Sequence, residues 1–222
     1  MFSFLCSSLG KKYLMALTGL GLIGFVIAHL IGNLQVFAGP EAINSYAQTL
    51  KDLGPLLWVA RGGLIVLFVT HLTLALQLNR TNQMARPIAY AKADTIKATL
   101  TSRTMVLSGL LILLYVIYHL LHFTIHIIDP SYTALLDAQG RHDVYQMIIA
   151  GFSHPVITTT YLLAMFVLAA HLHHGASSVF QTLGLNNGKY RPITSLIGPA
   201  LAFLVFVGYG SIPVGVMLGW IN

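Results

Sequence analysis

The chain has little charge and almost no cysteine. Of its 222 residues, 8% are charged and 56% are hydrophobic, and the mean hydropathy is +0.76. A water-soluble domain carries about 25% charged residues, so most of this surface cannot face water. Cys6 is the one cysteine, which excludes an intrachain disulfide, a Cys-x-x-Cys redox pair and the Cys-x-x-Cys-His motif that attaches haem covalently.

The sequence contains several long apolar runs with few or no charged residues. A helix of about 20 residues crosses the roughly 30 Å hydrocarbon layer, and a helix satisfies its own backbone in lipid. The first run is longer than the apolar part of a signal peptide and ends without a clear cleavage site, so it is a span. The sequence therefore predicts an all-α, integral membrane bundle forming a single domain over 1–222, with five helices at about 13–37, 56–79, 104–128, 155–180 and 195–220.

The basic residues predict an orientation, because positive loops stay in the cytoplasm. Nine of the twelve fall on one side: Lys11, Lys12, Arg80, Arg86, Lys92, Lys97, Arg103, Lys189 and Arg191. The other connections hold Lys51, Arg61 and Arg141 with five of the six acids. We expect a cytoplasmic amino end and an outside carboxyl end, and contact of the inner basic loop with anionic membrane lipid or a soluble partner. The basic residues are not interleaved with exposed aromatics, so nucleic acid is not an expected partner.

Histidine is abundant where charge is rare, since ten histidines exceed the six acids. At about 1.5 Å per helical residue, His29 lies about 25 Å beyond Lys12 and His119 about 24 Å beyond Arg103. His71 lies about 14 Å before Arg80, and His171 is equally far from the expected end of its helix. Four antiparallel helices thus present two imidazole pairs, one at an outer and one at an inner level.

Six-coordinate haem is the chemistry that uses such pairs. Its iron has two axial positions on opposite faces, which one imidazole from each of two facing helices can fill. A zinc site would instead gather its ligands at one depth. His122 is the alternative to His119, because the two residues share a helix face. His174 sits one turn inward of His171, where a partner for a haem propionate is the stronger interpretation.

At these residues the sequence resembles the five-helix, two-haem cytochrome b anchor subunit of succinate:quinone oxidoreductases and fumarate reductases. The segments that carry the resemblance run in order along nearly the whole chain: FVIAHLIGNLQVF around His29, GPEAINSYA at 39–47, FVTHLTLALQL around His71, the run from Arg103 through Gly109 to YHLLHF at His119, and HLHHG with His171 followed by Gly175.

The resemblance implies an electron-transfer subunit of the bacterial cytoplasmic membrane without a succinate site of its own. Flavoprotein and iron-sulfur subunits would oxidise succinate, and this chain would pass the electrons through two haem b groups to menaquinone or ubiquinone. His29 and His119 would hold the outer haem, and His71 and His171 the inner one. As an enzyme, the chain would be the quinone-side subunit of succinate:quinone oxidoreductase.

Further site residues follow from charge and polarity. Arg61 on the outer side, and Arg103 or His174 on the inner side, are candidates to bind propionates. Quinone reduction needs protons, so the polar outer residues Asn33, Gln35, Glu41 and Asn44 are candidates for a quinone site. Arg86, Lys92 and Lys97 are expected to help dock the iron-sulfur subunit.

Other functions fit parts of the same pattern. A two-haem anchor of another dehydrogenase shares all of the haem features. A histidine-bearing transporter would place the histidines along a pathway and would show internal repeats, which the sequence does not display. A purely structural anchor would bind no cofactor.

Overall fold

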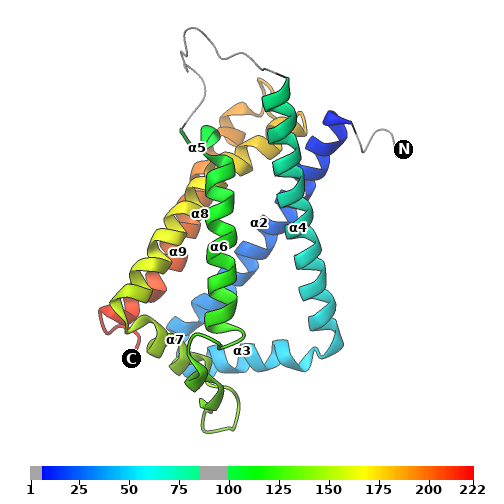
Figure 1. The fold of residues 1–222 in the computed structure, drawn as a ribbon. Helices are drawn as coiled ribbons and strands as arrows, with labels where there is room; N and C mark the ends of the chain where they lie inside the picture. Colours follow the sequence, from blue (N-terminus) through cyan, green and yellow to red (C-terminus); the bar gives the residue numbers. More distant parts are fainter. Residues whose placement is uncertain (1–6, 86–99) are drawn as a thin grey trace.

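The computed structural model describes residues 7–85 and 100–222, and the described chain is helical throughout apart from loops and one isolated bridge between Leu136 and His142. Five of its helices are long and apolar enough to cross a membrane: α2 (Ser8–Leu34), α4 (Pro55–Met84), α6 (Met105–Phe123), α8 (Pro155–Thr182) and α9 (Arg191–Met217) (Figure 1). The expected all-α architecture is confirmed, and the chain is a multi-pass membrane protein.

Local chemistry sets where the helices begin and end. Helices α4 and α8 start at a proline, whose missing N–H costs nothing in the first turn. Helix α2 starts five residues earlier than expected because the Ser7 hydroxyl caps it, accepting from the Gly10 N–H at 3.1 Å. Helix α6 ends at Phe123 instead of 128, and His126 lies beyond it with φ of +60°.

Shorter helices gather at one end of the bundle, and the sequence did not predict them. They are η1 (Gln35–Ala38), α3 (Pro40–Asp52), η2 (Pro130–Ala134) and α7 (Val144–Phe152). They lie beside the carboxyl terminus, at what we term the α3/α7 end (Figure 1). The opposite end, the amino-terminal end, holds the start of α2, the end of α4 and the short α5 (Leu100–Arg103).

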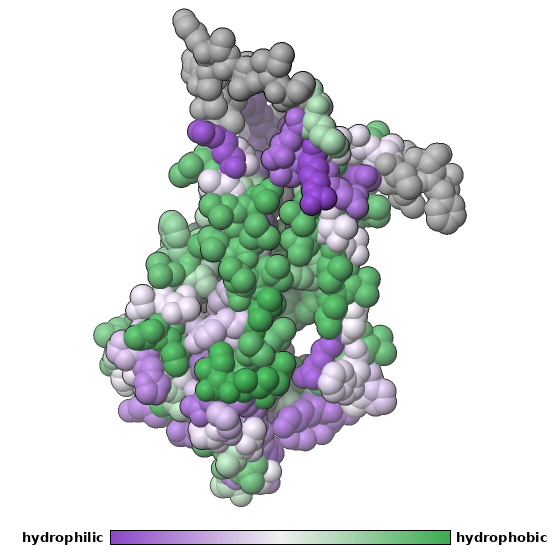
Figure 2. Space-filling model, viewed as in Figure 1, coloured by the Kyte–Doolittle hydropathy of each residue, from purple (hydrophilic) through white to green (hydrophobic). Residues whose placement is uncertain are grey.

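Charge divides between the two ends of the molecule. In the view of Figure 2, hydrophobic residues cover the middle of the surface and hydrophilic residues lie above and below it. Lys11, Arg80, Arg103 and Arg191 belong to segments at the amino-terminal end, whereas Arg141 and the acids of α3 lie at the α3/α7 end. Arg86, Lys92 and Lys97 lie outside the described residues, and which end faces the cytoplasm stays a prediction.

The five spans pack unevenly. Helix α8 packs along α9, and α2 packs along α4. A core cluster lies at the α3/α7 end and joins Val36, Ile43, Tyr145, Phe152 and Ile212. By contrast α4 and α6, both described in full, each bury a single residue, Leu74 and His122. Protein side chains therefore fill little of the space beside the two helices that carry His71 and His119.

Candidate cofactor site

His29 and His119 form the first imidazole pair. They come from α2 and α6, their ring centroids are 6.0 Å apart, and their planes are nearly perpendicular at 80°. Phe25 stacks on His29 at 5.3 Å. A metal–imidazole bond is about 2 Å long and the ring centroid lies about 1 Å behind the nitrogen, so two imidazoles on one iron have centroids about 6 Å apart. The separation in the protein matches this value.

His71 of α4 is held by a hydroxyl from α2. Its Nδ1 lies 3.1 Å from Thr18 Oγ1, and the same hydroxyl lies 2.8 Å from the carbonyl oxygen of Leu14. A hydroxyl has one proton, so when Thr18 donates to the backbone it accepts from His71 Nδ1–H. This tautomer leaves a lone pair on His71 Nε2, which is the form that binds a metal.

His171 of α8 repeats the arrangement on α6. Its Nδ1 lies 2.9 Å from Ser108 Oγ, and that hydroxyl lies 3.1 Å from the Met105 carbonyl oxygen. The same proton count leaves Nε2 of His171 with a free lone pair. His71 and His171 are thus each held through Nδ1 by a hydroxyl of a neighbouring helix, and their pairing on one haem stays a prediction.

A glycine follows each of the two anchoring hydroxyls. A Cβ at Gly19 would lie 3.4 Å from His71 Cε1, and one at Gly109 would lie 3.6 Å from His171 Cε1. The dipeptides Thr18-Gly19 and Ser108-Gly109 thus provide both a hydrogen-bond acceptor and room for a ring. The two hydroxyls were not predicted from the sequence, although a Thr-Gly and a Ser-Gly dipeptide inside apolar helices indicate such a site.

His119 and His122 differ in which nitrogens are engaged. Nδ1 of His119 lies 3.4 Å from Tyr161 Oη, and Nε2 makes no hydrogen bond within the described residues. Both nitrogens of His122 are bonded, Nδ1 to Tyr161 Oη at 3.0 Å and Nε2 to Tyr132 Oη at 3.3 Å, and its side chain is 0% exposed. Of the two residues, His119 has the nitrogen available to a metal.

The three residues predicted to bind haem propionates lie on three different helices. Arg61 lies over the ring of Trp58, with its guanidinium carbon 4.9 Å from the centroid, and Arg103 is exposed at the end of α5. His174 Nε2 lies 3.1 Å from Ser178 Oγ, one turn further along α8. The structure gives Arg61 and His174 a local contact, and the role of all three residues toward a propionate stays a prediction.

The quinone candidates take part in the packing of the α3/α7 end. Asn33 donates to the carbonyl oxygen of His29 at 2.7 Å, and Gln35 begins η1. Asn44 is 1% exposed, donates to Asp143 at 3.0 Å and accepts from the Tyr145 N–H at 3.1 Å. These contacts give Asn44 a structural role, and a quinone site among these residues stays a prediction.

An ion-pair cluster joins α3 to the loop before α7. Arg141 reaches Glu41 at 2.6 Å and Asp137 at 2.7 Å. The hydrogen bond from Arg141 lowers the pKa of Glu41. Burial acts to raise the pKa of Asp137, but hydrogen bonds from Arg141 and Gln139 outweigh it and lower that pKa, while the two carboxylates raise the pKa of Arg141. The cluster is therefore charged at neutral pH.

The donor set fits haem better than a protein-ligated metal ion. No group of three or more His, Cys, Asp or Glu side chains able to hold a metal ion occurs among residues 7–85 and 100–222. Imidazoles that come in pairs, with Nδ1 anchored on three of them and glycine beside two, are what a bis-histidine haem needs. A bound haem b would take His29 and His119 at one level and His71 and His171 at the other.

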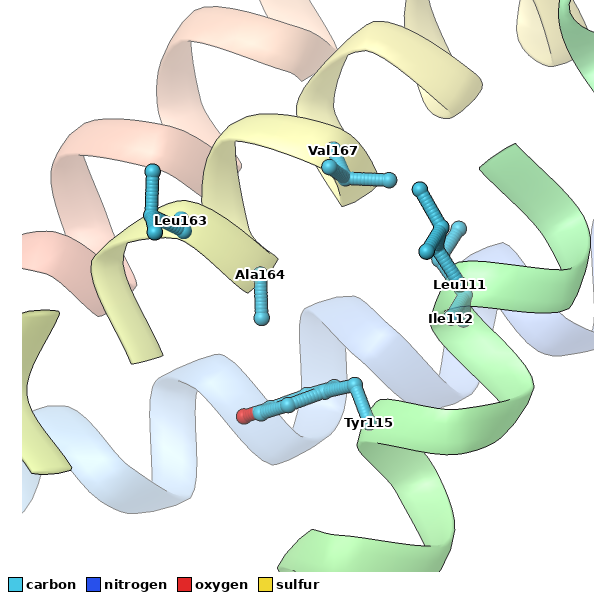
Figure 3. Close-up of a pocket in the computed structure, with 6 residues that line it drawn as sticks. All are labelled: Leu111, Ile112, Tyr115, Leu163, Ala164 and Val167. Carbon is cyan, nitrogen blue, oxygen red and sulfur yellow. The ribbon is translucent and has the colours of Figure 1, made fainter. Parts of the chain in front are cut away.

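An apolar cavity lies between the two levels. It has a volume of about 260 Å³ and is lined by Leu111, Ile112 and Tyr115 of α6 and Leu163, Ala164 and Val167 of α8 (Figure 3). Tyr115 precedes His119 by about one helical turn, and Val167 precedes His171 by one turn. The cavity adds apolar space between α6 and α8, next to the helical turns that carry His119 and His171.

Comparison of the chain with protein-family models, curated proteins and solved structures gives no significant match.

Proposed function

We propose that the chain is a two-haem cytochrome b that carries electrons through the membrane. The supporting observation is that three of the four paired imidazoles, His71, His119 and His171, have Nδ1 beside a hydroxyl and Nε2 without a hydrogen bond in the described structure. An intramembrane histidine costs free energy unless it has a partner. Anchoring one nitrogen while leaving the other open is the arrangement that a ligand needs and that a packing histidine does not.

The residues of this chain orient the ligands. Thr18 and Ser108 accept from Nδ1–H of His71 and His171, which fixes the tautomer and restrains rotation of the ring. Tyr161 stands in the same relation to His119. Bound haem would supply the one-electron redox centre. The lipid-facing surface of the five spans keeps bulk water from the ligands, and the two levels give a route along the bundle axis.

The resemblance of the histidine segments to anchor subunits of succinate:quinone oxidoreductases narrows the proposal. In that role the chain takes electrons from the iron-sulfur subunit of a succinate dehydrogenase, whose flavoprotein subunit oxidises succinate, and passes them to quinone. It lies in a bacterial cytoplasmic membrane, with the amino-terminal end inside. Succinate chemistry belongs to the partner subunits, and this chain provides the quinone side.

Haem content and reduction by succinate test the two parts separately. The purified chain should contain two haem b groups by pyridine haemochrome assay, with the spectrum of low-spin bis-histidine iron. A colourless protein would contradict the cytochrome proposal. Succinate should reduce the haem in the native complex; haem that responds to another donor and not to succinate would leave a two-haem cytochrome and refute the succinate dehydrogenase role.

A further inference from the structure

Three side chains continue from His119 toward the α3/α7 end. Tyr161 Oη lies 3.4 Å from His119 Nδ1 and 3.0 Å from His122 Nδ1, and His122 Nε2 lies 3.3 Å from Tyr132 Oη. We term this the Tyr161–His122–Tyr132 chain. Its members are 5%, 0% and 1% exposed, and they come from α8, α6 and η2. Because they are buried, their polar groups must find partners among themselves.

Coordination at His119 would fix the direction of every hydrogen bond in the chain. A neutral imidazole has one N–H donor and one acceptor nitrogen. With a metal on Nε2, His119 carries its proton on Nδ1 and donates to Tyr161 Oη. The Tyr161 hydroxyl then donates to His122 Nδ1, and His122 Nε2–H donates to Tyr132 Oη. The opposite direction would place the proton of His119 on Nε2, where it blocks the metal.

We infer that Tyr161 and His122 are positioning residues that act through His119 and lower the redox potential of the haem it holds; the inference rests on the proposed cytochrome function. An imidazole that donates from Nδ1 becomes a more basic ligand, which favours the ferric iron. Hydrogen bonds in a row polarise one another, so the donation from Tyr161 to His122 strengthens the one from His119 to Tyr161. Breaking the chain should therefore raise the potential.

The variants separate hydrogen bonding from packing. Tyr161→Phe removes the hydroxyl that accepts from His119, and His122→Leu removes the group to which Tyr161 donates. His122→Gln should keep the direction, because the amide oxygen can accept from Tyr161 while the amide nitrogen donates to Tyr132.

Tyr118→Phe is the matched control. The Tyr118 ring centroid is 5.6 Å from His122 and 5.9 Å from Tyr161. Tyr118 makes no side-chain hydrogen bond within the described part of the chain. Removal of the Tyr118 hydroxyl changes the same aromatic cluster and leaves the hydrogen bonds of the Tyr161–His122–Tyr132 chain in place.

The measurements are haem content and potentiometric titration of the purified full chain. All four variants should keep two haems. One of the two redox components should move to a more positive potential in Tyr161→Phe and His122→Leu and stay in place in His122→Gln and Tyr118→Phe. An unchanged potential in Tyr161→Phe, or an equal shift in Tyr118→Phe, would overturn the inference.

Haem loss separates the remaining outcomes. Loss of one haem in His122→Gln would identify His122 as a ligand and refute its positioning role. Absence of haem from the wild-type chain would instead refute the cytochrome function itself. If the wild type holds two haems and neither redox potential changes when the Tyr161–His122–Tyr132 chain is broken, the cytochrome function is retained and only this inference is refuted.

Discussion

At the scale of residues, the site depends on how hydroxyl groups use a single proton. Thr18 and Ser108 each have a backbone carbonyl within hydrogen-bond distance, so each can accept from a histidine while donating to its own helix. Inside the apolar bundle the hydroxyl group is therefore hydrogen-bonded, and the imidazole ring is held in one orientation. The price in helix propensity is small, because Ser and Thr cost only a few tenths of a kcal/mol in a helix.

The pairing of ligands predicts which substitutions act together. In the proposed cytochrome, His71→Leu should remove the haem that would be held with His171, and His29→Leu the one that would be held with His119, because a haem left with one of its two histidines is held weakly. Potentiometric titration of the two variants should show that different redox components have disappeared. If both variants lose the same component, the ligands are paired differently.

The depths of the four histidines along their helices could be predicted from the sequence, but their hydrogen-bond partners could not. Depth along a span follows from the regular rise of a helix, so His29 and His119 could be matched before any contact was known. The hydroxyl partners Thr18, Ser108 and Tyr161 come from other helices, and which helices face each other is decided by packing across the bundle. One of the two bonds that engage His122, the bond to Tyr132, depends on η2, which has no strong sequence signal.

At the scale of elements, the spans were predictable and the cap at the α3/α7 end was not. Uninterrupted apolar stretches predicted all five spans, with errors at the ends where capping decides. Helix α3 is amphipathic and short, and its position depends on long-range contacts such as Asn44 to Asp143 and Glu41 to Arg141. Those contacts join residues about 100 positions apart, so no local pattern reveals them.

The ion-pair cluster predicts how the cap responds to acid. The pKa values of Glu41 and Asp137 are lowered from 4.5 and 3.8, so their contribution to stability is present above those values and is lost as the pH falls through the lower folded-state values. Burial also lowers the pKa of His142 below 6.5, which adds a loss of stability as the pH falls below 6.5. Protection of α3 from hydrogen exchange should therefore decline with acidification.

Arg141→Gln supplies the test of that response. With the guanidinium removed, the two carboxylates lose their partner, and α3 should be less protected already at pH 7. Its further change between pH 7 and pH 3 should be smaller than in the wild type. Lys51→Gln is a matched control at pH 7, because it removes a positive charge from the last turn of the same helix and Lys51 forms no ion pair with Glu41 or Asp137 in the structure. Lys51 also lowers the pKa of His142, so the two variants are compared at pH 7 only. Equal effects of the two variants would show that net charge, and not the cluster, holds the cap.

At the scale of the whole molecule, two ends of unlike construction enclose an apolar middle. The α3/α7 end has a packed core and a capping network, whereas the amino-terminal end consists of helix ends that carry basic residues. The histidine levels lie between these ends, so in the proposed role electrons that enter at one end would leave near the other. A structured cap beside one level and a charged, open surface beside the other suit a chain that meets quinone at one side and a soluble partner at the other.

The basic surface at the amino-terminal end can be tested for a role in docking the soluble partner. Arg86, Lys92 and Lys97 lie in the connection between α4 and α6, outside the described residues, and this connection starts and ends at the amino-terminal end beside Arg80 and Arg103. The four basic residues of this short connection, together with Arg80 of α4, attract an acidic protein surface by long-range electrostatics, which salt screens. Replacing Arg86, Lys92 and Lys97 with Gln should reduce co-purification of the dehydrogenase subunits, most clearly at low salt where the attraction is least screened, while haem content stays at the wild-type value. Binding that is unchanged across the salt series would assign this loop to the lipid surface instead.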